Sequence, residues 1–77
     1  MTWAYLQMRA DPNHQTCTQA VVSSEAAEEG VPKCAKEPKP VLIRALEHAG
    51  KAGWELVAVA GPLPEDGGYV FWLKRQL

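Results

Sequence analysis

Residues 40–60 read as an amphipathic helix that runs directly into an apolar strand, and this pair limits what the chain can fold into. In residues 40–52 the apolar side chains fall at the i, i+3, i+4, i+7 spacing of one buried face: Leu42, Ala45, Leu46 and Ala49. Pro40 suits the first helical turn, because its missing N–H would have no partner there. The polar side carries Arg44, Glu47, His48 and Lys51. Residues 54–60 then alternate as a strand with apolar side chains on both faces, so we expect the helix to pack on a sheet that contains this strand.

Two further strands are predicted, one near each end of the chain. In residues 2–9 the aromatic residues favour extended backbone, and the side chains alternate between two faces. One face carries Trp3, Tyr5 and Gln7, and the other carries Ala4, Leu6 and Met8. Residues 69–74 alternate in the same way. The loop before them, residues 61–68, ends in a pair of glycines that is typical of a hairpin.

Residues 10–39 are irregular, and their pattern leaves several structures open. Residues 16–22 can form a short strand, because they are rich in β-branched side chains. Residues 23–30 can form a short helix, with a serine N-cap and a terminal glycine. Residues 31–40 hold Pro32, Pro38 and Pro40, which exclude regular interior structure. An irregular segment of this length is unusual in a small domain, so it is expected to be a functional loop, a mobile excursion or an insertion.

Together these elements predict a single α+β domain over residues 1–77. The fold is a small two-layer βαββ domain, with a three-stranded antiparallel sheet, one main helix and the long irregular segment between the first strand and the helix. A chain of 77 residues leaves too little volume for a second core.

The junction between helix and strand has its own chemistry. Gly50 and Gly53 offer two places for the helix to stop, since glycine tolerates the left-handed geometry of a C-cap. Trp54 is then the first inward residue of the strand and is expected to fix the helix to the sheet. Glu55 points away and needs water or a cation, for which Lys74 or Arg75 on the neighbouring strand is the natural partner.

Residues 46–57, LEHAGKAGWELV, followed by the aromatic strand YVFWLKR, resemble domain of unknown function 4177, a family of small bacterial and phage proteins. The matching positions are Trp3, Tyr5, Leu46, Gly50, Gly53, Trp54, Glu55, Leu56, Val57, Tyr69, Phe71, Lys74 and Arg75. The most specific element is the G-x-x-G-W-E-L-V junction. Residues 10–39 depart from the family pattern, because they are longer and more irregular than its usual connection. The resemblance implies a βαββ fold and no known activity.

A sheet with apolar residues on both faces cannot be covered by one helix. The predicted face opposite Phe71 and Leu56 carries Val57, Val59, Val70 and Trp72. An exposed apolar patch of this kind favours association. We therefore predict a homo-oligomer, most simply a two-fold dimer with sheet against sheet. The alternative is that residues 14–39 fold over this face as a lid.

Charge and hydropathy restrict the partners. Eight basic and nine acidic residues give a net charge of −1, which provides no broad positive surface for nucleic acid. No run approaches the roughly 20 apolar residues of a membrane span, and the N-terminus shows no targeting pattern. The sequence therefore predicts a cytoplasmic protein with no membrane partner, in which Cys17 and Cys34 are reduced thiols.

The residues that can hold metals or act as nucleophiles are few and poorly spaced. His14, Cys17, Cys34 and His48 are four potential ligands, but only the first two are close in sequence, so we predict no metal and no cofactor. A Cys17–Cys34 disulfide would tether the long loop, although a reducing compartment favours free thiols. No pattern places a base beside either thiol, so we predict that the protein is not an enzyme.

Binding is the activity that the residues favour. Aromatic and cationic side chains can together stack a base and hold a phosphate: Trp3, Tyr5, Arg9, His14, Tyr69, Trp72, Lys74 and Arg75. The predicted function is a small noncatalytic binding or interaction module that acts as a homo-oligomer. The first alternative is a protein that sequesters a small anionic metabolite or nucleotide signal, as some phage proteins do. The second is a thiol-dependent enzyme that uses Cys17 or Cys34.

Overall fold

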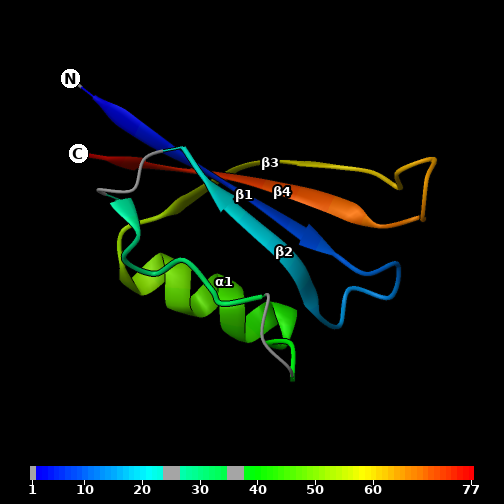
Figure 1. Cartoon of the computed structure of the whole chain (residues 1–77). Coiled ribbons are helices and arrows are strands. Elements are labelled where there is room, and N and C mark those ends of the chain that lie inside the picture. Colours follow the sequence, from blue (N-terminus) through cyan, green and yellow to red (C-terminus); the bar gives the residue numbers. More distant parts are fainter. Residues whose placement is uncertain (1, 24–26, 35–37) are drawn as a thin grey trace.

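The computed structural model describes residues 2–23, 27–34 and 38–77, which form two layers (Figure 1). The described residues contain four strands and one helix. In chain order these are β1 (Trp3–Ala10), β2 (Cys17–Val22), α1 (Leu42–Lys51), β3 (Glu55–Ala60) and β4 (Tyr69–Gln76). The strands make one antiparallel sheet in the order β2-β1-β4-β3. The helix lies against one face of this sheet, beneath it in the view of Figure 1.

The prediction of a three-stranded sheet is wrong, because the short strand left open for residues 16–22 does form and, as β2, adds a fourth strand to the sheet. A tight turn brings β2 back along β1. In that turn the Asp11 carboxylate accepts hydrogen bonds from the backbone N–H groups of Gln15 and Thr16, at 2.6 and 3.0 Å. The overall class is α+β, as predicted. Ser24, Glu25 and Ala26, in the middle of the short helix expected over residues 23–30, lie outside the described residues.

The helix is shorter at its N-terminus than predicted, because the backbone before it pairs with the start of β2. Cys17 N–H donates to the Pro40 carbonyl at 2.9 Å, and Leu42 N–H donates to the Gln15 carbonyl at 2.8 Å. Val41 is the N-cap and has no side-chain capping bond. Pro40 therefore precedes the helix instead of entering its first turn. The loop carbonyl of Gln15 satisfies one of the backbone donors at the start of the helix that have no partner within the helix.

A β-bulge changes which residues of β3 share a face. Leu56 lies opposite Leu73, but the register shifts at Val57, so that Ala58 lies opposite Trp72 and Val59 opposite Phe71. Directly opposed residues project to the same side of an antiparallel sheet. Val59 is therefore on the same face as Leu56 and Phe71, and its predicted place on the opposite face is wrong. An extra residue reverses the alternation that follows it, which simple period-2 counting cannot anticipate.

The core lies between the sheet and the helix. On β1 every second residue is buried on this side, namely Ala4, Leu6, Met8 and Ala10. The helix contributes Leu42, Ala45 and Ala49, and the segment of residues 27–34 contributes Ala27 and Cys34. Residues 27–34 therefore pack on the same side as α1 and not over the opposite face of the sheet.

The helix-to-strand junction is built around Trp54, which is 4% exposed. Gly53 has φ 92°, a left-handed conformation that lets the chain turn sharply after the helix. The Trp54 indole N–H donates to the Glu29 carbonyl at 2.7 Å, and the Arg75 guanidinium lies 5.4 Å from the ring centroid. Glu55 stands opposite Lys74 in the register of β3 and β4. The helix continues through Gly50 and ends at Lys51.

Two glycines near this junction predict opposite effects of the same substitution. Gly30 has φ 78°, and an added Cβ would lie 2.5 Å from the Ala52 Cβ. Gly50 is inside α1, and an added Cβ would meet nothing within 4 Å. We expect Gly30→Ala to lower the free energy of unfolding by about 2 kcal/mol or more, through strain and overpacking. Gly50→Ala should raise it by roughly 0.5–1 kcal/mol, because alanine is the better helix former.

Urea unfolding monitored by tryptophan fluorescence measures both variants, and Gly50→Ala is the matched control for a Gly-to-Ala change as such. A urea midpoint for Gly30→Ala at or above that of the wild type would contradict the packing described for Gly30.

Candidate functional site

The face of the sheet opposite α1 carries a row of exposed aromatic side chains. Because β1 buries its even-numbered residues against the helix, Trp3 and Tyr5 project to the other side, where they are 36% and 51% exposed. On β4, Trp72 lies opposite Gln7 and Lys74 lies opposite Tyr5, so both join this face; Trp72 is 42% exposed. We call this surface the open face, defined by Trp3, Tyr5, Arg9, Val21, Glu55, Trp72 and Lys74.

The two central strands hold the open face together. The Lys74 ammonium lies 4.6 Å from the centroid of the Trp3 ring, a cation–π contact between β4 and β1. Arg9 stands opposite Val70 at the other end of the same strand pair. The aromatic side chains therefore run from the Trp3 end of the face to its middle, with Lys74 among them and Arg9 toward the other end. Both central strands are hydrogen-bonded on both edges.

Three of the predicted ligand-binding residues do not belong to this face. Arg75 alternates to the helix side, where its guanidinium donates to the Ala52 carbonyl at 3.1 Å and lies 3.7 Å from the Glu29 carboxylate. The rings of His14 and Tyr69 contact each other edge to face near the β1–β2 turn, with their centroids 4.0 Å apart. His14 has φ 58°. The other five predicted residues, Trp3, Tyr5, Arg9, Trp72 and Lys74, share the open face.

β2 extends the open face beyond the predicted residues. Val21 lies opposite Gln7 and is 49% exposed, and Gln19 lies opposite Arg9. The β-branched residues in 16–22 indicated a possible strand in the sequence. Which of its residues face outward could be identified only once this strand was placed beside β1.

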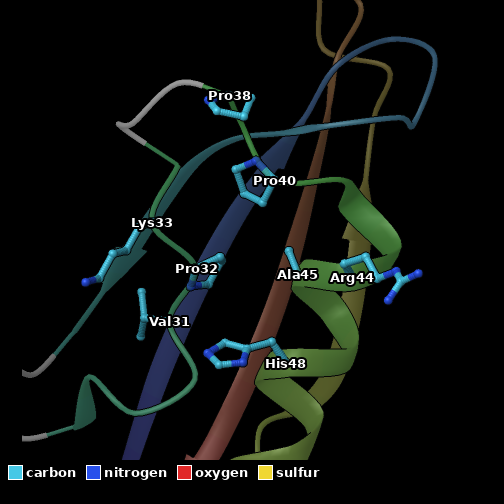
Figure 2. Close-up of a pocket in the computed structure, with 8 residues that line it drawn as sticks. All are labelled: Val31, Pro32, Lys33, Pro38, Pro40, Arg44, Ala45 and His48. Atoms are coloured by element: carbon cyan, nitrogen blue, oxygen red, sulfur yellow. The ribbon is translucent and has the colours of Figure 1, made fainter.

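A cavity of about 330 Å³ lies on the other side of the molecule, between α1 and the proline-containing segment (Figure 2). Its described lining is Val31, Pro32, Lys33, Pro38, Pro40, Arg44, Ala45 and His48. Figure 2 shows the His48 ring reaching from α1 toward Val31 and Pro32, while the charged ends of Lys33 and Arg44 point outward on opposite sides. The described lining residues include three basic side chains and no acidic one. Sequence reasoning missed this cavity, because proximity between the prolines and the helix is a tertiary property.

A second cavity of about 290 Å³ adjoins the first. It shares the wall of residues 31–33 and is lined on its far side by Ala20, Val22 and Glu28. The short segment from Val31 to Lys33 thus separates two hollows.

The two cysteines meet in the core. Their Sγ atoms are 2.7 Å apart, both thiols are free, and Cys17 is fully buried. Burial and, secondarily, the hydrogen bond to Cys34 raise the pKa of the Cys17 thiol to about 12. Cys17 is therefore a protonated thiol at neutral pH.

Among the described residues, no three His, Cys, Asp or Glu side chains converge as a metal site would require. No described helix is long and apolar enough to cross a membrane.

Comparisons with known proteins found no matching family model, no matching curated protein and no matching solved structure. The resemblance to domain of unknown function 4177 therefore stays a prediction based on the G-x-x-G-W-E-L-V junction.

The raised pKa of Cys17 predicts a loss of stability at alkaline pH. The ordinary pKa of the thiol is 9.0, so the folded state holds this proton more tightly than the unfolded state. The stability that this adds is fully present below about pH 9 and is lost as pH rises from 9 toward 12. Cys17→Ala removes the titration and should lower the free energy of unfolding at pH 7 by roughly 1–2 kcal/mol, through the cavity left behind.

Urea unfolding with a reductant at pH 7, 8, 9 and 10 measures both proteins. The free energy of unfolding of the wild type minus that of Cys17→Ala should be constant from pH 7 to 8 and should become smaller above pH 9. A difference that stays constant up to pH 10 would contradict this role of the buried thiol.

Proposed function

We propose that this chain is a noncatalytic interaction module that binds a second copy of itself through the open face. The observation that supports this is the exposure of Trp3, Tyr5 and Trp72 on the face that α1 leaves uncovered. Aromatic side chains are the residues that contribute most to protein interfaces, because each buries a large area with few rotatable bonds. Single exposed aromatic residues are common, but here they adjoin on two neighbouring strands.

The shape of the open face suits another sheet. Strands β1 and β4 have eight residues each, which corresponds to a length of roughly 27 Å. Four strands spaced about 4.8 Å apart make the platform roughly 14 Å wide between its outer strands. Two such faces can pack about 10 Å apart as a sandwich related by a two-fold axis. Within residues 14–39, β2 is part of the sheet and Ala27 and Cys34 pack on the helix side, so these described parts leave the face free for a partner.

The charges on the open face favour a copy of the same chain. Lys74 and Glu55 stand opposite each other on β4 and β3, so the face carries both signs at one end. In a two-fold dimer Lys74 and Glu55 of one copy can face opposite charges on the other copy, beside the aromatic side chains. Charged rims around an apolar centre are the usual anatomy of an interface.

The test is native mass spectrometry and sedimentation of wild type, Trp72→Glu and Ile43→Glu. The wild type should be a dimer at micromolar concentration. Trp72→Glu should shift it to monomer, because a carboxylate would be buried among aromatic side chains. Ile43 on α1 is 63% exposed and serves as the matched control, so Ile43→Glu should remain dimeric.

A monomeric wild type would contradict the proposal. So would a dimer that survives Trp72→Glu and dissociates with Ile43→Glu, since that result would assign the interface to the helix side. Far-UV circular dichroism establishes whether each variant is folded.

A second candidate function is the binding of a small anion, and the cavity of Figure 2 is the observation that favours it. Its volume of about 330 Å³ falls at the lower end of small-molecule sites. Prolines and Ala45 supply an apolar wall, and Lys33, Arg44 and His48 supply cationic or hydrogen-bonding groups. This combination fits a ligand with a small apolar body and one phosphate or carboxylate group.

Chemical-shift mapping with phenyl phosphate tests this candidate, with benzyl alcohol as the neutral comparison. Phenyl phosphate should shift the amide signals of Val31, Lys33 and Ala45, and the neutral compound should shift them far less. Arg44→Ala should weaken binding several-fold, whereas Lys51→Ala, on the same helix outside the described lining, should leave it unchanged. Equal loss in both variants, or shifts confined to the open face, would contradict a site in this cavity.

The remaining alternative, a thiol-dependent enzyme, has the least support. A nucleophilic cysteine requires an accessible thiolate. Cys17 and Cys34 are both buried, and the raised pKa of Cys17 keeps its thiol protonated at neutral pH. We therefore propose no catalytic role for either residue.

A further inference from the structure

Two buried thiols from distant parts of the sequence are in contact between the sheet and the segment of residues 27–34. Cys17 begins β2 and is 0% exposed; Cys34 ends the segment and is 3% exposed. Their Sγ atoms are 2.7 Å apart, and both thiols are free. We propose that Cys17 and Cys34 form a reversible intrachain disulfide that fixes residues 27–34 to the sheet.

The backbones of both cysteines are already held in place for this bond. Cys17 N–H donates to the Pro40 carbonyl at 2.9 Å, and Lys39 Nζ donates to the Cys34 carbonyl at 2.8 Å. A disulfide holds its sulfur atoms at about 2.05 Å, so the two Sγ atoms have only about 0.6 Å to close.

A low-molecular-weight disulfide, of the class of glutathione disulfide, is the oxidant that balances the reaction. One cysteine, as its thiolate, attacks a sulfur of this compound, which forms a mixed disulfide and releases one small thiolate. The second cysteine then attacks the protein sulfur of the mixed disulfide, which forms the Cys17–Cys34 bond and releases the second small thiolate. The oxidant gains two electrons, and the two protons lost by the cysteines are taken up by the two leaving thiolates.

Burial slows the first step, and the proximity of the two thiols speeds the second. The first attack requires residues 27–34 to open, because neither thiol is accessible in the closed structure. The second step is fast by comparison, since the partner thiol is adjacent once the segment closes. Oxidation is therefore slow in the folded protein and selective for the intrachain bond.

The disulfide would change the part of the molecule that lines both cavities. Residues 31–33 form the wall between the two hollows, and Cys34 follows directly. In the reduced form this wall is held by packing and by the Trp54 N–H bond to the Glu29 carbonyl. In the oxidised form a covalent bond closes a loop from Cys17 to Cys34, which restricts the opening of the wall.

Incubation of the full chain in mixtures of reduced glutathione and glutathione disulfide, followed by alkylation and intact-mass measurement, tests the proposal. The expected product has lost two hydrogen atoms, carries no glutathione and takes up no alkylating agent. Its Tm should exceed that of the reduced protein by roughly 10 °C or more. Return to the reduced mass in excess reduced glutathione would establish that the bond is reversible.

Cys34→Ala is the matched control, because it removes one thiol from the edge of the core and leaves Cys17 in place. Its Tm should not depend on the redox buffer. A stable glutathione adduct on the wild type would overturn the proposal, as would a wild-type protein that stays reduced throughout. An equal dependence of Tm on the buffer in wild type and Cys34→Ala would overturn it as well.

Discussion

The packing of Trp54 is the interaction on which the rest of the structure depends. Its ring is buried where helix, sheet and the 27–34 segment meet, and its N–H group binds the Glu29 carbonyl. Arg75 lies over the ring from β4 and also binds the Ala52 carbonyl after the helix. One aromatic side chain thus connects three parts of the chain that are far apart in sequence. The position of residues 31–34, and with it the cavity wall and the contact of Cys34 with Cys17, follows from this connection.

Local patterns in the sequence were sufficient to predict the helix and the strands β1, β3 and β4, but not the four-stranded sheet. The alternation in residues 2–9 and the i, i+3, i+4 spacing in residues 42–49 each follow from one period, and both elements exist close to the predicted bounds. The fourth strand could not be assigned from its residues alone, because β2 is stabilised by pairing with β1 and by the Asp11 turn, and not by a strong pattern of its own. The bulge at Val57 was invisible for a related reason, since it is defined by the partner strand.

The candidate site likewise has a part that local patterns predict and a part that depends on the tertiary fold. Five of the eight predicted ligand-binding residues share one face because they alternate on two paired strands, which sequence can indicate. Of the three that do not, Arg75 is explained by the same alternation: it follows Lys74 directly, so it must project to the other side. The cavity could not be predicted, and the meeting of the two cysteines could only be raised as an alternative, since both depend on where an irregular segment folds back. An irregular chain has no period from which its partners can be deduced.

The two edges of the sheet bear on how two copies would meet. An unpaired edge strand is a ready template for joining another sheet side by side, and natural proteins often disturb it with a bulge. Both edges are disturbed here: the β1–β2 ladder is irregular between Arg9 and Ala10, and the β3–β4 ladder between Leu56 and Ala58. A regular continuous sheet across two copies is disfavoured at either edge. The open face has no such obstacle, because Trp3, Tyr5, Trp72 and Lys74 come from the two central strands, whose mutual register is regular over all eight pairs. Face-to-face packing is therefore the form of self-association that this sheet geometry favours.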